Sequence, residues 1–191
     1  MRRLALYARS RQVAVPILAL VLGTALLLGL SRWLWDGRVG IPSMIIVMTL
    51  GLAAASPGLA GSDHDLDRTA SFSWPPRRAT HLIGLGVVTT GLSLAINATL
   101  DSGLPAGVIL RDVAGQVGLL GLGVALIGGS FGWCLPFLFM VLAQVPGMSD
   151  VPVAGWLVQP ADTVSATVTA AVAVNAGLLS YLTFDPRRTR S

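Results

Sequence analysis

The chain has 191 residues, of which 53% are hydrophobic and 12% are charged, and its mean hydropathy is +0.73. Soluble globular domains carry about a quarter charged residues. The composition therefore excludes an ordinary water-soluble domain and indicates a single unit embedded in a membrane. The single cysteine, Cys134, excludes an internal disulfide and a cysteine metal cluster.

Six apolar stretches in chain order predict an all-α polytopic protein with one transmembrane domain over residues 1–191. A Gly-rich turn at 128–132 divides the long apolar run after residue 105 into two helices. A polar loop at 61–80 separates the second stretch from the third. We expect the helices at about 13–30, 41–60, 81–100, 106–127, 133–145 and 163–184.

The arginines predict the orientation of these helices. All thirteen basic side chains are arginines, and with the N-terminus inside, ten of them fall in cytoplasmic segments. Cytoplasmic loops of membrane proteins carry an excess of Lys and Arg. We therefore expect a multi-pass protein of a bacterial plasma membrane with both termini cytoplasmic. The arginines lie at the ends of the predicted helices and not on one face, which argues against a nucleic-acid partner.

No catalytic residues are expected. The sequence has no G-x-x-x-x-G-K-[ST] phosphate-binding loop, so the chain does not hydrolyse ATP unaided. Ser130 has no histidine or acid placed to activate it, and a nucleophile needs such a base. We expect no cofactor and no bound metal in this chain.

Arg111 and Asp112 are the only charged residues set within an apolar stretch. One interpretation is a pair at the start of a helix, with Arg111 reaching the outer headgroups. The other places Arg111 inside the bundle, facing a cavity or a second subunit. A charge within the hydrocarbon costs several kcal/mol, so a deep Arg111 would require a partner.

The loop at 61–80 is the most informative polar segment. Ser62 or Asp63 can cap a short helix, and the aspartates in its first turn complement its dipole. Leu66, Ala70 and Phe72 give that helix an apolar side. Such a helix at the cytoplasmic face suits docking to a partner. A solvated loop with interfacial Trp74 is the alternative.

Six helices, this cytoplasmic loop after the second helix and an amphipathic segment before the sixth resemble the membrane subunit of an ABC-2-type exporter. Four stretches are also similar to small actinobacterial membrane proteins associated with ABC transporters: DLDRTASFSWPPRRATH, LRDVAGQVGL, WCLPF and GWLVQPAD. The short outer loops depart from larger permeases of this type. The resemblance implies separate ABC ATPase subunits that hold ATP and magnesium, a second membrane subunit and contact with the lipid bilayer.

The resemblance also assigns residue roles. It implies a re-entrant segment at 153–158 with Trp156 at the interface. Arg111, Asp112 and Trp156 are the candidates for a substrate cavity or a subunit contact. Contact with the ATPase would fall on Asp65, Leu66, Asp67, Arg68, Thr69 and Phe72. The predicted function is the transmembrane subunit of an ATP-driven exporter of a hydrophobic or amphipathic substrate.

Two alternatives stay open. The substrate-binding membrane component of an energy-coupling-factor importer also has six helices in about this length, and would bind a vitamin-like ligand. A non-transporting accessory protein would hold another membrane subunit in place. Close helix packing is expected at small residues such as Gly118, Gly121, Gly123, Ala170, Ala171 and Ala173.

Overall fold

The computed structural model describes residues 40–59, 74–100 and 102–183, together with the single residues Leu22, Ala25 and Gly29. All regular secondary structure in these ranges is helical. The predicted helix at 13–30, except for those three residues, lies outside them, as do 60–73 and 184–191. The helices are α3 (Ile41–Leu59), α5 (Trp74–Leu100), α6 (Ala106–Ile127), α7 (Cys134–Gln144) and α8 (Val164–Thr183).

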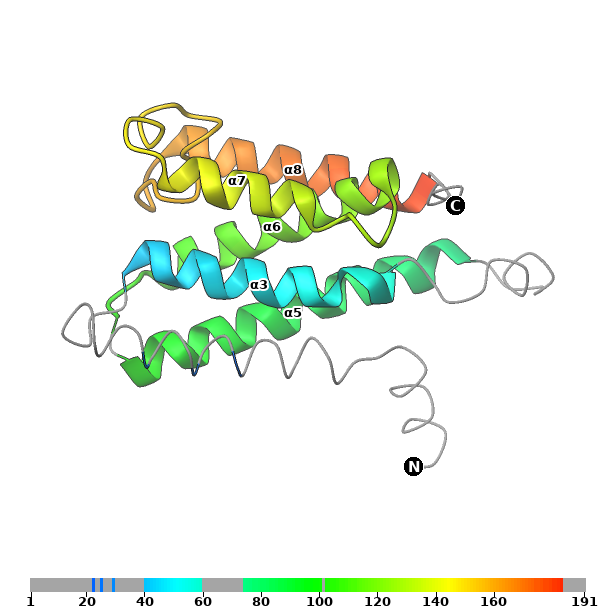
Figure 1. The fold of residues 1–191 in the computed structure, drawn as a ribbon, viewed down its shortest axis with the longest axis horizontal. Coiled ribbons are helices and arrows are strands. Elements are labelled where there is room, and N and C mark those ends of the chain that lie inside the picture. The colour runs from blue at the N-terminus through cyan, green and yellow to red at the C-terminus, as the bar shows by residue number, and fades with distance from the viewer. Residues whose placement is uncertain are drawn as a thin grey trace.

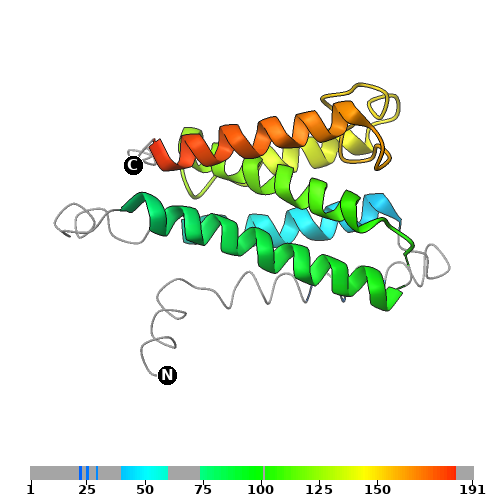
Figure 2. The ribbon, with the colours of Figure 1, turned by 180° about the vertical axis from the view of Figure 1, so that it is seen from behind.

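The five helices run along one common direction and form a bundle around α6 (Figure 1). Helix α6 contacts each of the other four. Seen from behind, α5 lies in front of α3, and α8 lies on the opposite side of α6 (Figure 2). Within the candidate spans, 78% of α6 is buried, but only 17% of α5 and 28% of α8. Helix α6 is thus the core of the bundle, while most residues of α5 and α8 are at least partly exposed.

Three of the described helices are long and apolar enough to cross a membrane: Arg78–Leu100 of α5, and α6 and α8 over their full lengths. The helical class predicted from the sequence is confirmed, and a membrane-embedded protein is indicated. Helix α3 is also apolar, but its stretch Ile41–Pro57 is shorter than these three spans. The 11 residues of α7 extend over only about 16 Å, roughly half the hydrocarbon thickness. Six spanning helices are therefore not established.

The predicted boundaries are close to the observed ones except at the start of α5. This helix begins at Trp74, seven residues before the expected start at residue 81. The last part of the predicted loop at 61–80 is therefore helical. Two prolines follow Trp74, and proline is compatible with the first turn of a helix because the N–H groups there have no intrahelical partner.

The turn predicted at 128–132 is present, because α6 ends at Ile127 and α7 begins at Cys134. Gly128 at the end of α6 has a φ of 103°, in the region that favours glycine. Ser56 donates a hydrogen bond from α3 to the Gly129 carbonyl oxygen over 2.6 Å. The turn is thereby fixed against the neighbouring helix.

Two hydrogen-bonded contacts define the ends of the bundle. The Tyr181 hydroxyl of α8 donates to the Leu59 carbonyl oxygen over 2.7 Å, which brings the end of α8 beside the end of α3. At the other end, Asn97 donates from α5 to the Leu104 carbonyl oxygen over 3.0 Å. The end of α3, the start of α5 and the end of α8 therefore lie at one end of the bundle (Figure 1).

Candidate functional site

Arg111 and Asp112 lie inside the bundle. Their side chains are only 6% and 3% exposed, and Arg111 Nε donates to Asp112 Oδ1 over 2.8 Å. The remaining guanidinium nitrogens donate to backbone carbonyl oxygens of the turns before α8: Nη1 to Pro160 and Nη2 to Gln159, each over 2.9 Å. Every nitrogen of the guanidinium thus has a protein acceptor, and Arg111 connects α6 to the chain that leads into α8.

Trp156 is also fully buried. Its indole ring lies over Gly115 of α6, so that a methyl group added at Gly115 would overlap the ring. Leu157 beside it is buried as well, and both belong to a cluster with Leu119 and Ala170. The glycine on α6 opens a space into which the whole indole packs, whereas the expected position of Trp156 at the membrane interface stays a prediction.

The segment before α8 consists of a series of turns, not of a helix. Backbone hydrogen bonds from Met148 to Val145, from Val151 to Met148 and from Gly155 to Val151 close successive turns. The sequence resemblance implied re-entrant helices near 153–158, and the described backbone contains none there. Two prolines, Pro152 and Pro160, break helical continuity in this stretch.

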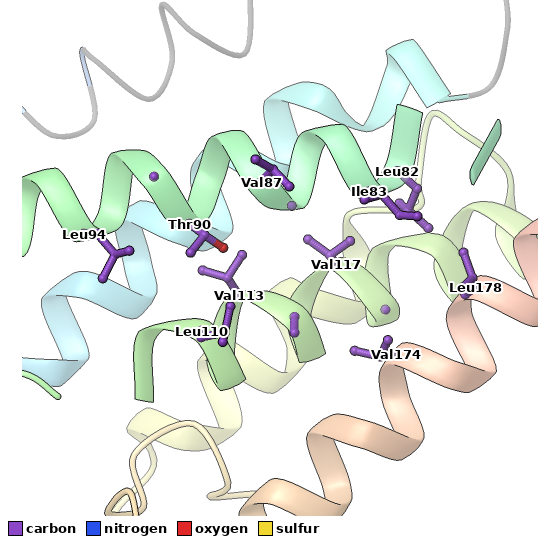
Figure 3. A pocket seen from close by; sticks show the side chains of 14 residues that line it. Leu82, Ile83, Val87, Thr90, Leu94, Leu110, Val113, Val117, Val174 and Leu178 are labelled. Carbon is purple, nitrogen blue, oxygen red and sulfur yellow. The ribbon is translucent and has the colours of Figure 1, made fainter. Parts of the chain in front are cut away.

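An apolar groove of about 440 Å³ runs between α5 and α8, with α6 as its floor (Figure 3). Val113 and Val117 of the floor are buried, whereas Ile83 and Val87 of the α5 wall are largely exposed, so the groove opens to the outside of the bundle. Thr90 has the only polar side chain among its residues. The lining consists of Leu82, Ile83, Gly86, Val87, Thr90, Gly91, Leu94, Leu110, Val113, Ala114, Val117, Gly118, Val174 and Leu178.

Small residues decide the shape of this groove. A methyl group added at Gly86 would meet Val117 at ordinary contact distance, and one added at Gly91 would meet no neighbour. On the opposite side, Gly118 lies directly against the backbone of Ala173, which draws α6 and α8 together. Close packing at Gly118 and Ala173 was predicted from the sequence and is confirmed, whereas Ala171 faces outward.

Arg111, Asp112 and Trp156 line no part of the groove. The expectation that they form a substrate cavity or a subunit contact is not supported, because all three are buried against α6 and the turns before α8. The physical reason is that the guanidinium and the indole find their partners within the chain. Their geometry is that of a structural contact.

Several buried hydroxyls and amides lie between the helices. The Thr49 hydroxyl of α3 is 2.8 Å from the Ile45 carbonyl oxygen and 2.7 Å from Gln116 Oε1 of α6. A hydroxyl has one proton, so it donates to one of them at a time. On α5, Thr89 and Ser93 are fully buried, and their hydroxyls have no hydrogen-bond partner within the described residues.

The six residues predicted to contact an ATPase, from Asp65 to Phe72, lie outside the described residues. The groove was not anticipated from the sequence. A signal for it exists in the glycines of α5 and α6, which interrupt otherwise apolar helices. Within the described residues, no group of three or more His, Cys, Asp or Glu side chains could hold a metal ion.

Comparison of the chain with models of protein families, with curated proteins and with solved structures finds no match.

Proposed function

We propose that the chain is the transmembrane subunit of an ATP-driven ABC transporter that exports a hydrophobic or amphipathic substrate. A separate ATPase, which binds ATP and magnesium, would dock on the loop at 61–80. A second membrane subunit, identical or related, would complete the transporter. The proposal places both termini in the cytoplasm of a bacterial cell and assigns no catalytic residue and no nucleic-acid partner to this chain.

The observation that carries the proposal is the course of α5. This helix is continuous from Trp74 to Leu100, so it begins within the proposed docking loop. The residues from Leu82 to Leu94 then form one wall of the apolar groove. The first of them lies eight residues after Trp74, about 12 Å along the helix axis. A displacement of the loop would therefore move the groove wall through a single rigid element.

The lining of the groove supports the class of substrate. Apolar side chains and glycines form nearly all of it, and it opens between two helices that are long enough to cross a membrane. Over Leu82 to Leu94 the groove extends about 18 Å along α5, close to the roughly 15 Å thickness of one hydrocarbon leaflet. A hydrophobic chain entering from the bilayer matches these dimensions, whereas a strongly polar solute finds few partners.

The arrangement of the helix ends is consistent with the proposed orientation. The hydrogen bond between Tyr181 and Leu59 puts the end of α8 beside the end of α3. The last described residues before the loop at 61–80 and before the Arg-rich C-terminal residues, Leu59 and Thr183, therefore lie at the same end of the bundle. The loop and the C-terminal residues are rich in arginine, and arginine-rich segments favour the cytoplasmic side of a membrane.

A double substitution in the loop tests the docking. Arg68→Glu with Phe72→Ala reverses a charge and removes an apolar side chain, and we expect it to release a co-purifying ATPase in mild detergent. Arg188→Glu with Phe184→Ala makes the same two changes near the C-terminus and should retain the ATPase. The membrane subunit itself should keep its wild-type thermal unfolding in both variants. ATPase retained by the loop variant would refute the assignment of the docking site.

A further inference from the structure

The outward face of α8 carries a polar residue in the middle of an apolar surface. Asn175 is exposed, and it lies about 2 Å along the axis from the centre of the 20-residue helix. Large apolar neighbours surround it: Val168, Val172 and Leu179 are 54%, 62% and 63% exposed. If α8 crosses the bilayer, this amide lies near the middle of the hydrocarbon.

The amide is only partly satisfied by its own helix. Asn175 Nδ2 donates one hydrogen bond to the Ala171 carbonyl oxygen over 2.8 Å. The second N–H and the Oδ1 acceptor have no partner within the described residues. Lipid chains offer neither hydrogen-bond donors nor acceptors, so exposing an incompletely paired amide to them costs free energy.

The residues around Asn175 form a seam suited to helix pairing. Spacings of three and four residues place them on one side of α8, as in the a and d positions of a coiled coil. We call this set the α8 outer stripe. It comprises Val164, Val168, Val172, Asn175 and Leu179, all of them exposed.

We propose that the α8 outer stripe binds the same stripe of a second copy of this chain. Two copies inserted in the same direction are related by a two-fold axis along the membrane normal, so their α8 helices pair in parallel. Asn175 then faces its own counterpart, and each amide supplies the donor and the acceptor that the other lacks. A single polar residue in such a seam also fixes the register of the two helices.

The other open helix face lacks this feature. Between residues 83 and 95 of α5 the exposed residues have no polar side chain, so lipid can cover the middle of this face without an unpaired group. They are Ile83, Gly84, Val87, Val88, Gly91 and Ala95. The inference deepens the proposed function, because it identifies the second membrane subunit as a copy of this chain and gives its docking face. It can be tested on the purified chain without any ATPase.

Cross-linking of the full chain in lipid vesicles tests the interface. In a Cys134→Ala background, Val172→Cys should form disulfide-linked dimers on mild oxidation, and Val88→Cys on α5 should not. A monomer at Val172→Cys, or cross-linking at Val88→Cys instead, would overturn the proposal.

Substitution of the amide tests its chemistry. Asn175→Leu should weaken self-association in vesicles, measured by energy transfer between labelled copies, by between about threefold and thirtyfold. Asn175→Gln keeps an amide and should restore much of the affinity. If Asn175→Leu associates as strongly as the wild type, Asn175 does not lie at the interface. A dimer that captures no ATPase would leave this inference standing and contradict the proposed function. An ATPase-bound chain paired with a different membrane subunit would do the reverse.

Discussion

At the scale of single residues, the sequence identifies Arg111 and Asp112 as unusual because they are charges in an apolar stretch. It does not identify the acceptors on Gln159 and Pro160, which are 48 and 49 residues away along the chain. Only the packing of the turns against α6 brings them together. The same holds for Trp156, because the sequence does not show that Gly115 leaves the space for its indole ring.

The buried ion pair leads to a prediction about stability. Arg111→Met leaves the Asp112 carboxylate without its partner, and we expect a loss of about 3–5 kcal/mol in the free energy of unfolding. The double variant Arg111→Met with Asp112→Leu should recover part of the loss, because no buried charge is then left unpaired. Unfolding by a denaturing detergent in mixed micelles measures both. A loss below about 1 kcal/mol for Arg111→Met would contradict the structural assignment.

The contact between Gly115 and Trp156 leads to a second prediction. Gly115→Ala places a methyl group in the indole ring and should destabilise the bundle by about 1–3 kcal/mol. Gly91→Ala is a matched control on α5, because an added methyl group meets no neighbour there, and it should change stability by less than about 1 kcal/mol. The same detergent titration compares them, and equal losses would show that the indole does not occupy this position.

At the scale of helices, hydropathy and glycine placement predict α6, α7 and α8 to within a residue or two, because apolar runs end there at clear turns. The predicted start of α5 is too late, because polar residues and two prolines are typical both of a loop and of the first turn of a helix. Element lengths are thus well predicted inside the apolar stretches and less well at polar ends.

The continuity of α5 leads to a prediction about coupling. Ala79→Pro lies between Phe72, the last predicted ATPase contact, and Leu82, the first residue of the groove wall, and it should kink or break α5 there. In a Cys134→Ala background, a cysteine at Val87 should react with a membrane-soluble maleimide at a rate that changes on addition of ATP to the reconstituted complex. We expect Ala79→Pro to abolish that change while the ATPase stays bound, and Ala79→Ser to preserve it. An ATP response that persists in Ala79→Pro would show that α5 does not transmit the movement.

At the scale of the whole molecule, composition predicts a membrane-embedded helical protein, and the three long apolar helices agree with it. The groove could not be predicted, because it depends on how α5, α6 and α8 pack and not on any one of them. The same packing leaves α5 and α8 largely exposed around a buried α6. A bundle with two open faces is consistent with a subunit that has further membrane partners.

The composition of the native complex tests the central claim most directly. The full chain would be purified from its own membranes in a mild detergent, and the subunits that accompany it would be identified and quantified by mass spectrometry. We expect an ABC ATPase in near-stoichiometric amount, together with a second membrane subunit. Purification of the chain without any ATPase, from membranes in which it is intact, would contradict it.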